Sequence, residues 1–452
     1  MAKMYVAFLL DLFQPSSQND KVIDEVTREC YQPLVELFNS KPNAKFTVSL
    51  ANSLASLLIE FRKDKVIEGL KQAVKFGKIE MIHTGAYHPI FPLLPDQEVK
   101  RQIALDKDLK SEHFGVTTTS GIFSPEMCYH DKLLPLYQEM GFQWTIIDDC
   151  VMEINGIRIP QHEIYHVNDI AVFMRSELWS NRIKNGHHLT GREFVRQMEA
   201  EIQLQQQDCY TIIAISGETF GHHVKYYQET FLRDMLCKLS KSDSVELCLV
   251  SDLLNIKGLS KIEKPKEVGQ IFEYFPPCSW ATQPDNYKRG DYYPLWKSKD
   301  NPIHENLWKL TDLIWDANSN INFNIEGDEQ HSGLNKLRDL LDRAFYSTQY
   351  FWASIWFWNP ERIYEGIDLQ MRTLYLTASL MDNYELLKAG QEIYTQLMWA
   401  IHQRTQEELN SELDKSLAKL NTDSDFKKRI LPWLNSIKQA IDYHELRNIN
   451  NT

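Results

Sequence analysis

The sequence lacks several features that mark specialised classes of protein. Its seven cysteines are scattered and show no C-x-x-C spacing, which argues against a disulfide framework and a zinc knuckle. The apolar run in MAKMYVAFLLDLFQP contains an acidic residue and has no A-x-A-like cleavage site, and it is too short to span a membrane. We therefore interpret this run as a first strand, and we expect a cytoplasmic protein with reduced thiols.

An excess of positive charge is also missing. The formal net charge is -13, so we expect neither nucleic acid nor an anionic membrane as the main partner. Charged residues make up 25% and hydrophobic residues 43%, which is ordinary for a soluble globular protein. Aromatic residues reach 12%, and their faces can stack on sugar rings, although most aromatic side chains fill cores. The 452 residues are enough for one large domain and a second unit.

Short apolar runs alternate with amphipathic segments over roughly the first 256 residues. We expect strands at Met4–Phe13, Lys45–Ala51, Ile79–Thr84, Val116–Phe123, Gln143–Asp148, Ile170–Arg175, Thr211–Ile215 and Val245–Val250. We expect helices at Lys21–Phe38, Ser53–Phe76, Gln97–His113 and Thr190–Gln206, with Asp96 and Thr190 as N-caps. This alternation predicts parallel strands with crossover helices. Seven or eight such units fit a closed β/α barrel better than an open sheet.

The rest of the chain has a different character. Residues 257 to about 300 are irregular and rich in aromatic side chains, which is typical of an ordered loop over a site. From Ile303 onward the pattern is helical, and Gln349–Trp358 is apolar all round, so we expect a helix packed on both sides there. Thr405–Asn421 and Ser424–His444 are expected as charged amphipathic helices. The predicted domains are residues 1–300, a barrel with its aromatic loop, and residues 301–452, a helical region packed on it.

Polar side chains follow several successive predicted strands. Thr211–Ile215 is a β-branched run typical of a buried strand, and Gly217, Glu218 and His222 follow it closely. The same kind of residue ends the other strands: Asp11, Phe13 and Gln14; His83, Tyr87 and His88; Glu126; Asp148 and Asp149; Arg175, Glu177 and Trp179; and Ser216. Because the functional residues of β/α barrels gather at the carboxyl ends of the strands, these groups predict a cleft at that face.

Several of these stretches together resemble glycoside hydrolase family 57, the α-glucan amylases and 4-α-glucanotransferases. Phe13-Gln14-Pro15 stands where the first motif of the family reads His-Gln-Pro. Gly77–Pro95 resembles its Gly-x-x-Glu strand with a following His-Pro, and Gly121–Tyr129 resembles its aromatic-x-x-Glu motif. Ile215–His223 resembles Asp-Gly-Glu-x-Phe-Gly-His-His. The segments Phe173–Ile183, Ser279–Thr282 and Tyr293–Trp296 also resemble family members of this layout.

The resemblance implies an incomplete seven-stranded (β/α)7 barrel followed by a helical C-terminal region. It also implies a retaining mechanism, in which two carboxyl groups about 5–5.5 Å apart flank the scissile bond. By motif, Glu126 takes the nucleophile position and Ser216 the acid/base position. The expected partner is an α-glucan or malto-oligosaccharide, with no metal and no cofactor. The expected substrate-binding residues are Phe13, Gln14, Glu80, His88, Asp148, Arg175, Glu218, His222 and Trp280.

Two of these positions depart from the family pattern. A serine hydroxyl at position 216 cannot offer a proton near working pH, and such acid/base assistance is typically worth roughly 10²–10⁴-fold in rate. Phe13 replaces a histidine that, by resemblance, holds the sugar. Two departures in one cleft indicate that the ordinary reaction is absent.

Three hypotheses follow. The first, which we favour, is an α-glucan binder with impaired or lost glycosidase chemistry, a pseudoenzyme that binds glucan or regulates an amylase partner. The second is an active α-glucan hydrolase or 4-α-glucanotransferase with a relocated acid/base, for which Glu218, His222, His223 and His88 are candidates. The third is a metal-dependent deacetylase-like barrel. That third site needs an Asp pair and a His-x-x-x-His ligand set at strand ends, whereas Asp148 and Asp149 are expected to face opposite ways and no such His pair follows an expected strand.

Overall fold

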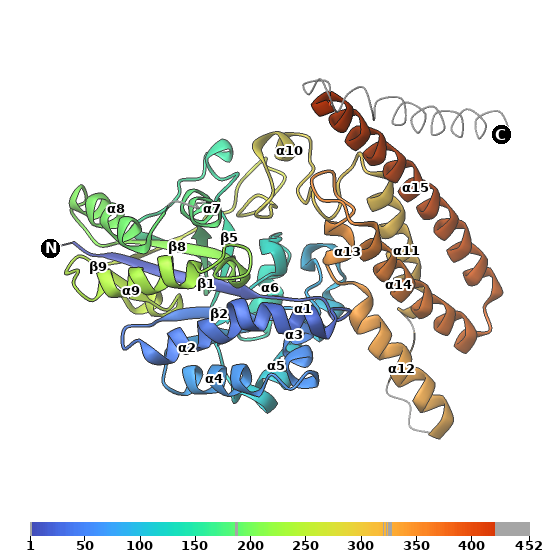
Figure 1. Ribbon diagram of the computed structural model, residues 1–452, viewed down its shortest axis with the longest axis horizontal. Coiled ribbons are helices and arrows are strands. Elements are labelled where there is room, and N and C mark those ends of the chain that lie inside the picture. The colour runs from blue at the N-terminus through green and yellow to red at the C-terminus, as the bar shows by residue number, and fades with distance from the viewer. Residues whose placement is uncertain (1, 186–188, 320, 322, 324–327, 421–452) are drawn as a thin grey trace.

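The computed structural model describes residues 2–185, 189–319, 321, 323 and 328–420 (Figure 1). The helix expected at Ser424–His444 lies outside these residues. None of the described helices combines the length and the apolar character needed to cross a membrane. Strands and their covering helices make up one side of Figure 1, and a group of helices that ends with the long α15 makes up the other.

Two sets of strands form the centre of the first part. In the first set, β1 pairs in parallel with β2, β8 and β9, and β3 continues beyond β2. In the second set, the parallel neighbours β4, β5 and β7 are extended by β6 and β10. The bounds are β1 (Met4–Leu12), β2 (Phe46–Leu50), β3 (Ile79–Ile82), β4 (Gly121–Ile122), β5 (Trp144–Asp148), β6 (Glu163–Val167), β7 (Ile170–Arg175), β8 (Cys209–Ser216), β9 (Val245–Cys248) and β10 (Ser260–Glu263).

The two sets meet along both of their sides. A parallel bridge between His83 and Ile122 connects the end of β3 with β4. On the other side, the Ser176 N–H after β7 donates to the Ile212 carbonyl of β8 at 2.9 Å. The prediction of an α/β fold with parallel strands is confirmed. It missed β6 and β10, and the strand expected over Val116–Phe123 is reduced to the two residues of β4.

Side-chain alternation in β1 and β8 determines what reaches the carboxyl ends of these strands. Phe8 and Leu10 pack with the helices around the strands. Ala7 and Leu9 face the opposite way, into a third apolar cluster that also contains Ala214 of β8. Since side chains alternate with a period of two, Asp11 continues the side of Leu9, and Ser216 continues the side of Ala214. The strand pattern thus brings two polar side chains to one end of the apolar interior.

Among the described residues up to position 239, nine α-helices accompany the strands. In Figure 1, α2, α3 and α4 lie below β1 and β2, and α8 and α9 lie close to β8 and β9. The bounds are α1 (Asp20–Val26), α2 (Gln32–Ser40), α3 (Asn52–Glu60), α4 (Asp64–Lys75), α5 (Asp96–Phe114), α6 (Leu133–Glu139), α7 (Glu177–Asn185), α8 (Gly191–Gln203) and α9 (Asp234–Leu239).

The helix boundaries follow local chemistry. Thr190 caps α8 in a capping box with Glu193, as predicted. Asp96 is not the cap of α5 but its first residue, because Pro95 takes the extended cap conformation. The single helix expected over Ser53–Phe76 is divided into α3 and α4, and Arg62 between them has the left-handed φ of 55°.

After a long irregular segment, the described elements are helices. They are α10 (Pro284–Lys288), α11 (Pro302–Asn318), α12 (Asp328–Ala344), α13 (Thr348–Phe351), α14 (Pro360–Met381) and α15 (Tyr384–Leu420). The helix predicted over Gln349–Trp358 is wrong: α13 ends at Phe351 and the chain then turns. The reason is local, because Asn359 N–H bonds back to the Trp352 carbonyl at 3.1 Å and the Asn359 side chain caps α14. Ile355 and Trp356 are consequently exposed.

Candidate active site

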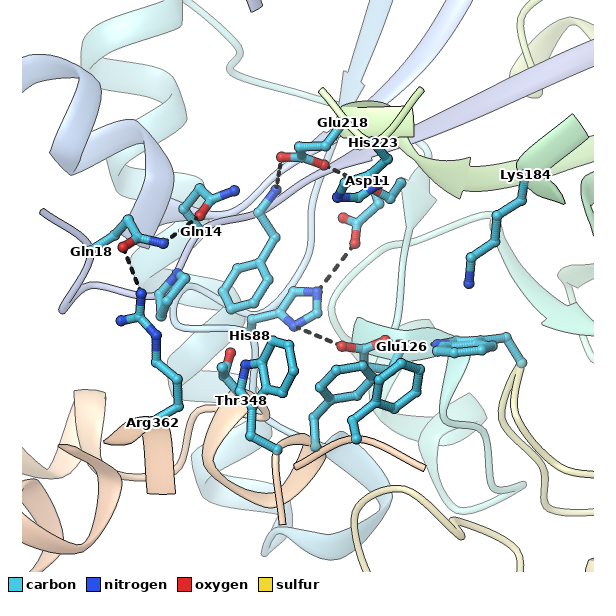
Figure 2. Close-up of a pocket in the computed structure, with 17 residues that line it drawn as sticks. Asp11, Gln14, Gln18, His88, Glu126, Lys184, Glu218, His223, Thr348 and Arg362 are labelled. Atoms are coloured by element: carbon cyan, nitrogen blue, oxygen red, sulfur yellow. Dashed lines mark hydrogen bonds and ion pairs between the residues drawn. The ribbon is translucent and has the colours of Figure 1, made fainter. Parts of the chain in front are cut away.

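A cleft of about 480 Å³ opens at the carboxyl ends of β1 and β8 (Figure 2). One wall comes from the strand ends and the loops after them, and the other from the segment around α13 and the start of α14. The residues that line it are Asp11, Phe13, Gln14, Pro15, Gln18, His88, Glu126, Lys184, Ser216, Glu218, His223, Trp280, Thr348, Phe351, Trp352, Phe357 and Arg362. A smaller cavity of about 110 Å³ shares five of them and adds Arg175.

The structure brings most of the sequence-predicted residues to this cleft. Phe13, Gln14, His88, Glu126, Ser216, Glu218 and Trp280 line it, and Arg175 lines the smaller cavity.

Three predicted residues lie elsewhere. Glu80 is the second residue of β3, far from the carboxyl end, and its carboxylate accepts from Thr47 Oγ1 at 2.5 Å and from the Ser251 N–H at 3.1 Å. Asp148 is buried beneath the cleft and pairs with Arg175 at 2.6 Å. His222 bonds to Glu29 at 2.8 Å.

Glu126 occupies the nucleophile position in an unusual backbone conformation. Its φ is 59° and its ψ is 17°, in the left-handed region that non-glycine residues rarely adopt. Trp280 Nε1–H donates to Glu126 Oε2 at 2.7 Å, and His88 Nδ1 lies 3.8 Å from Oε1. Burial raises the pKa of Glu126, while the charge of His88 and the bond from Trp280 oppose this rise. The backbone turn directs a largely buried carboxylate into the cleft.

His88 lies between two carboxylates. Its Nε2 lies 3.2 Å from Asp11 Oδ2, and its Nδ1 lies 2.9 Å from the Ser347 hydroxyl, on the side that faces Glu126 (Figure 2). Phe13 stacks on the imidazole at a centroid distance of 3.9 Å. Burial alone lowers the pKa of His88, but the bond to Asp11 and the charges of Asp11 and Glu126 more than offset it, so this pKa lies above its ordinary value. Phe13 therefore packs on a polar group of the cleft.

Ser216 and Glu218 form one hydrogen-bonded unit. The Ser216 hydroxyl donates to Glu218 Oε2 at 2.7 Å, while Oε1 accepts from the Tyr31 hydroxyl at 2.6 Å and the Phe13 N–H at 3.3 Å. Burial raises the pKa of Glu218, and the bonds from Tyr31 and Ser216 oppose it. Both oxygens of Glu218 thus have protein partners. At position 216 there is a hydroxyl that is already used as a donor.

Two further cleft residues carry nitrogen groups: Lys184 on α7, which no sequence motif singled out, and His223, one of the predicted candidates for a relocated acid/base. Lys184 Nζ lies 4.2 Å from the centroid of the Trp280 ring, and burial together with Arg175 lowers its pKa, against the attraction of Glu126. Burial and the neighbouring His222 lower the pKa of His223 to about 4. No sequence pattern around Lys184 predicts that it lies in the cleft, because only the turn of α7 brings it there.

The opposite wall of the cleft comes from the segment around α13 and consists largely of aromatic side chains. Phe351 and Phe357 stack at 4.4 Å, and Trp352 lies edge-on to Phe351 at 5.3 Å. Arg362 donates to Gln18 at 2.9 Å and so connects α14 to the loop after β1. These aromatic residues fall in the segment predicted as a buried helix. Their grouping was the available signal for an aromatic wall.

A group of carboxylates next to the cleft departs from expectation. Asp148, Asp149 and Glu177 each place an oxygen within 4.8 Å of the others. The expectation that Asp148 and Asp149 face opposite ways fails because β5 ends at Asp148, so strand alternation does not apply to Asp149. Asp148 is paired with Arg175, and Asp149 accepts from the Glu177 N–H at 2.9 Å. Burial and the charge of Asp148 raise the pKa of Asp149 to about 7.

Parallel strands that end in a cleft lined by a largely buried carboxylate and by aromatic side chains define an α/β protein with its candidate active site at the strand ends. The family model of glycosyl hydrolase family 57 matches residues 4–269, more than half of the chain. The chain belongs to glycosyl hydrolase family 57, as the motifs predict.

The chain is similar in sequence to curated relatives over part of their length. An α-amylase of Pyrococcus horikoshii is 23% identical over 308 residues, which are 62% of this chain and 44% of the relative. A 4-α-glucanotransferase of Thermococcus litoralis is 26% identical over 268 residues, 56% of this chain and 39% of the relative. The chain thus spans less than half the length of these relatives.

Solved structures share the fold. A GH57 branching enzyme of Thermococcus kodakaraensis has a TM-score of 0.66 at 15% identity, covering 87% of this chain and 94% of the other. The α-amylase AmyC of Thermotoga maritima has a TM-score of 0.59 at 14% identity, covering 89% of this chain and 97% of the other.

Proposed function

We propose that this chain binds an α-glucan or malto-oligosaccharide in the cleft, and that its retaining glycosidase chemistry is impaired or lost because Ser216 occupies the acid/base position. The observation that carries this proposal is the Ser216 hydroxyl, which donates to Glu218 at 2.7 Å instead of presenting an acid. The names of the relatives, α-amylase and 4-α-glucanotransferase, support α-glucan as the ligand class.

The proposal includes the architecture that carries the cleft. We propose an incomplete (β/α)7 barrel within residues 1–300, supported by the contacts that join the two strand sets on both sides. We propose residues 301–452 as the second domain, and its described elements up to Leu420 are helices. Its α13–α14 segment completes the cleft. A cytoplasmic location is supported by the seven cysteines, all of which are free thiols.

In this proposal each wall has a defined task. Trp280, Phe351 and Trp352 offer flat faces against sugar rings. Glu126 is the carboxylate available to attack the anomeric carbon, and the Trp280 N–H keeps one of its oxygens in place. The substrate is then bound and oriented, but the leaving oxygen receives no proton from position 216. Slow cleavage, or binding without cleavage, follows from this arrangement.

A second candidate is an active α-glucan hydrolase or 4-α-glucanotransferase with a relocated acid/base. One observation favours it: Asp11, a carboxylic acid, lines the same cleft directly beside Ser216. We do not propose the metal-dependent deacetylase-like alternative, because Asp148 is already paired with Arg175 and the group of Asp148, Asp149 and Glu177 does not line the cleft.

Three measurements on the purified protein test the proposed function. The protein is incubated with maltoheptaose and with glycogen, the products are separated by chromatography, and retention on insoluble starch is measured in parallel. We expect retention on starch and slow product formation that disappears in Glu126→Ala. Glu126→Gln, which keeps the shape of the side chain, should still bind starch. Absence of both retention and products would refute the proposal, and products that persist in Glu126→Ala would refute the role of Glu126.

A further inference from the structure

Asp11 lies on the strand next to the position of the missing acid. In the parallel pairing of β1 and β8, Asp11 is the register partner of Ser216. Neighbouring strands lie about 4.8 Å apart, and residues in register point to the same face of a sheet. The Asp11 carboxyl therefore lies beside the region that a carboxyl at position 216 would occupy, about one strand spacing away. Asp11, Ser216 and Glu126 all line both the cleft of about 480 Å³ and the smaller cavity of about 110 Å³.

The hydrogen bonds of Asp11 leave part of its carboxyl unused. Asp11 Oδ2 bonds to His88 Nε2 at 3.2 Å, whereas Oδ1 is buried and has no partner among the described residues. The Asp11 side chain is 17% exposed, so the group borders the cleft and is not sealed in the core. A buried polar oxygen without a partner is costly, so Oδ1 is available to bond to a group of a bound ligand.

Three of the other candidates for the acid/base have roles that their contacts already define. Glu218 accepts three hydrogen bonds, from Tyr31, Ser216 and the Phe13 backbone, which fixes it as a support of the strand ends. His222 pairs with Glu29 outside the cleft. His88 lies under the Phe13 ring and is held by Asp11 and Ser347, which makes it a positioning residue for Asp11.

We propose that Asp11 is the proton-transferring carboxyl group for the reaction at Glu126, with His88 as its positioning residue. This inference rests on the proposed function. Asp11 on β1 then supplies the acid/base function that Ser216 on the neighbouring strand β8 cannot supply.

The two steps balance as in any retaining glycosidase. In the first, the Glu126 carboxylate bonds to the anomeric carbon, the glycosidic C–O bond breaks, and its electron pair stays on the leaving oxygen, which takes the proton of Asp11. In the second, the Asp11 carboxylate takes a proton from water or from an acceptor sugar hydroxyl. The oxygen of that group bonds to the anomeric carbon, and Glu126 leaves as a carboxylate.

Asp11→Asn is the direct test, with maltoheptaose and α-maltosyl fluoride as two substrates. Maltoheptaose needs a proton on its leaving oxygen, and we expect its turnover to fall by about 10²–10⁴-fold in the variant. Fluoride leaves without a proton, so the variant should release about one equivalent of fluoride in a burst and then stop at the glycosyl ester. Added azide should restore steady release and yield α-maltosyl azide, because azide attacks the ester without a base.

A second variant keeps the test decisive if Asp11→Asn is less stable. The double variant Asp11→Asn/Ser216→Asp moves the carboxyl back by one strand and should recover maltoheptaose turnover. Asp64→Asn, at an exposed position at the start of α4, serves as a matched control that should behave as the unmodified protein.

Three results would overturn the inference. They are turnover of maltoheptaose in Asp11→Asn equal to that of the unmodified protein, a loss of the fluoride burst in that variant, and accumulation of the ester in the unmodified protein. If one of these results is obtained and the unmodified protein still binds glucan, the inference about Asp11 fails but the proposed function does not. If the unmodified protein neither binds starch nor releases fluoride, the proposed function itself fails, and the role of Asp11 fails with it.

Discussion

Glu126 and Glu218 are both carboxylates in one cleft, but their partners give them different tasks. Glu126 accepts one hydrogen bond, from the Trp280 indole, and its other oxygen faces the His88 ring at 3.8 Å. Glu218 accepts hydrogen bonds at both oxygens from three protein donors. A carboxylate that must form a new bond needs a free lone pair, whereas one that fixes a loop needs full pairing. At this scale the contacts favour Glu126 as the reactive group of the proposed reaction and Glu218 as a structural one.

The pKa of Glu126 gives a residue-scale prediction. Removing the Trp280 N–H by Trp280→Phe leaves the Glu126 carboxylate without the bond that opposes the rise from burial, so its pKa should rise further. Because the nucleophile must be ionised, the acidic limb of the pH profile for fluoride release from α-maltosyl fluoride should shift to higher pH. Trp352→Phe, which changes a lining ring without a bond to Glu126, is the control. An acidic limb at the same pH in both variants would contradict the assignment.

At the scale of the elements, the strands were the part most readily predicted. Their runs are apolar and β-branched, and burial on both faces needs such runs in parallel sheets. β1 and β8 were located almost to the residue, and with them the polar groups that follow. β6 and β10 carry charged and polar residues, including Glu163 and Lys261, and therefore gave no apolar run to detect.

Segment Gln349–Trp358 shows why the second wall of the cleft escaped prediction. Hydrophobic character alone cannot distinguish side chains that pack in a core from those that face a cleft. Here Ala353 and Ser354 are buried, while Ile355 and Trp356 are exposed at 60% and 46%. The break depends on Asn359, whose backbone bonds back to Trp352, and such an irregular turn leaves no period in the sequence.

The contact between α5 and α12 yields an element-scale prediction. Arg338 on α12 bonds to Glu98 on α5 at 2.8 Å and to Asp342 at 2.8 Å. Burial raises the pKa of Glu98 to about 7, and the Arg338 charge opposes this rise. Arg338→Met leaves Glu98 buried without its cation, so we expect a loss of roughly 3–5 kcal/mol in the free energy of unfolding at pH 8. At pH 5.5 the loss should be smaller, since Glu98 can be protonated there.

Urea unfolding at the two pH values measures this loss. Arg372→Met, which removes an exposed arginine paired with Asp368 along α14, should change the free energy of unfolding by less than about 1 kcal/mol. Equal losses for Arg338→Met at pH 8 and pH 5.5 would show that the buried Glu98 charge is not the cause.

At the scale of the whole molecule, Asp149 predicts how stability depends on pH. Its pKa is raised from 3.8 to about 7 by burial and by Asp148. The folded state therefore binds more protons than the unfolded state between these pH values, and the free energy of unfolding falls as the pH rises from about 4 to about 7.

Asp149→Asn should remove the part of this pH-dependent fall in the free energy of unfolding that Asp149 causes. We expect the variant to be more stable at pH 8 by an amount on the order of 2–4 kcal/mol, and nearly equal in stability to the unmodified protein at pH 4. The asparagine can still accept the Glu177 N–H, so the backbone contact is kept. Urea unfolding over this pH range is the measurement, and parallel curves for the two proteins would contradict the prediction.

The molecule as a whole explains which parts of the cleft the sequence could reveal. Residues that stand in recognisable motifs, such as Glu126, Ser216 and Trp280, could be located by resemblance. Lys184 and Arg362 enter through the packing of helices that are remote in the chain, and no local pattern records such packing. Asp11 was visible as a strand end, but its importance arises from its register with Ser216, which only the assembled sheet shows.

The central claim is that Ser216 limits the reaction of an otherwise α-glucan-adapted cleft. The most direct test is kcat/KM for maltoheptaose in Ser216→Asp compared with the unmodified protein, with Phe13→His/Ser216→Asp beside it. We predict a gain of about 10²-fold or more in at least one of these folded variants, because acid/base assistance is typically worth roughly 10²–10⁴-fold. No gain in either variant, with both folded and still binding starch, would contradict the claim.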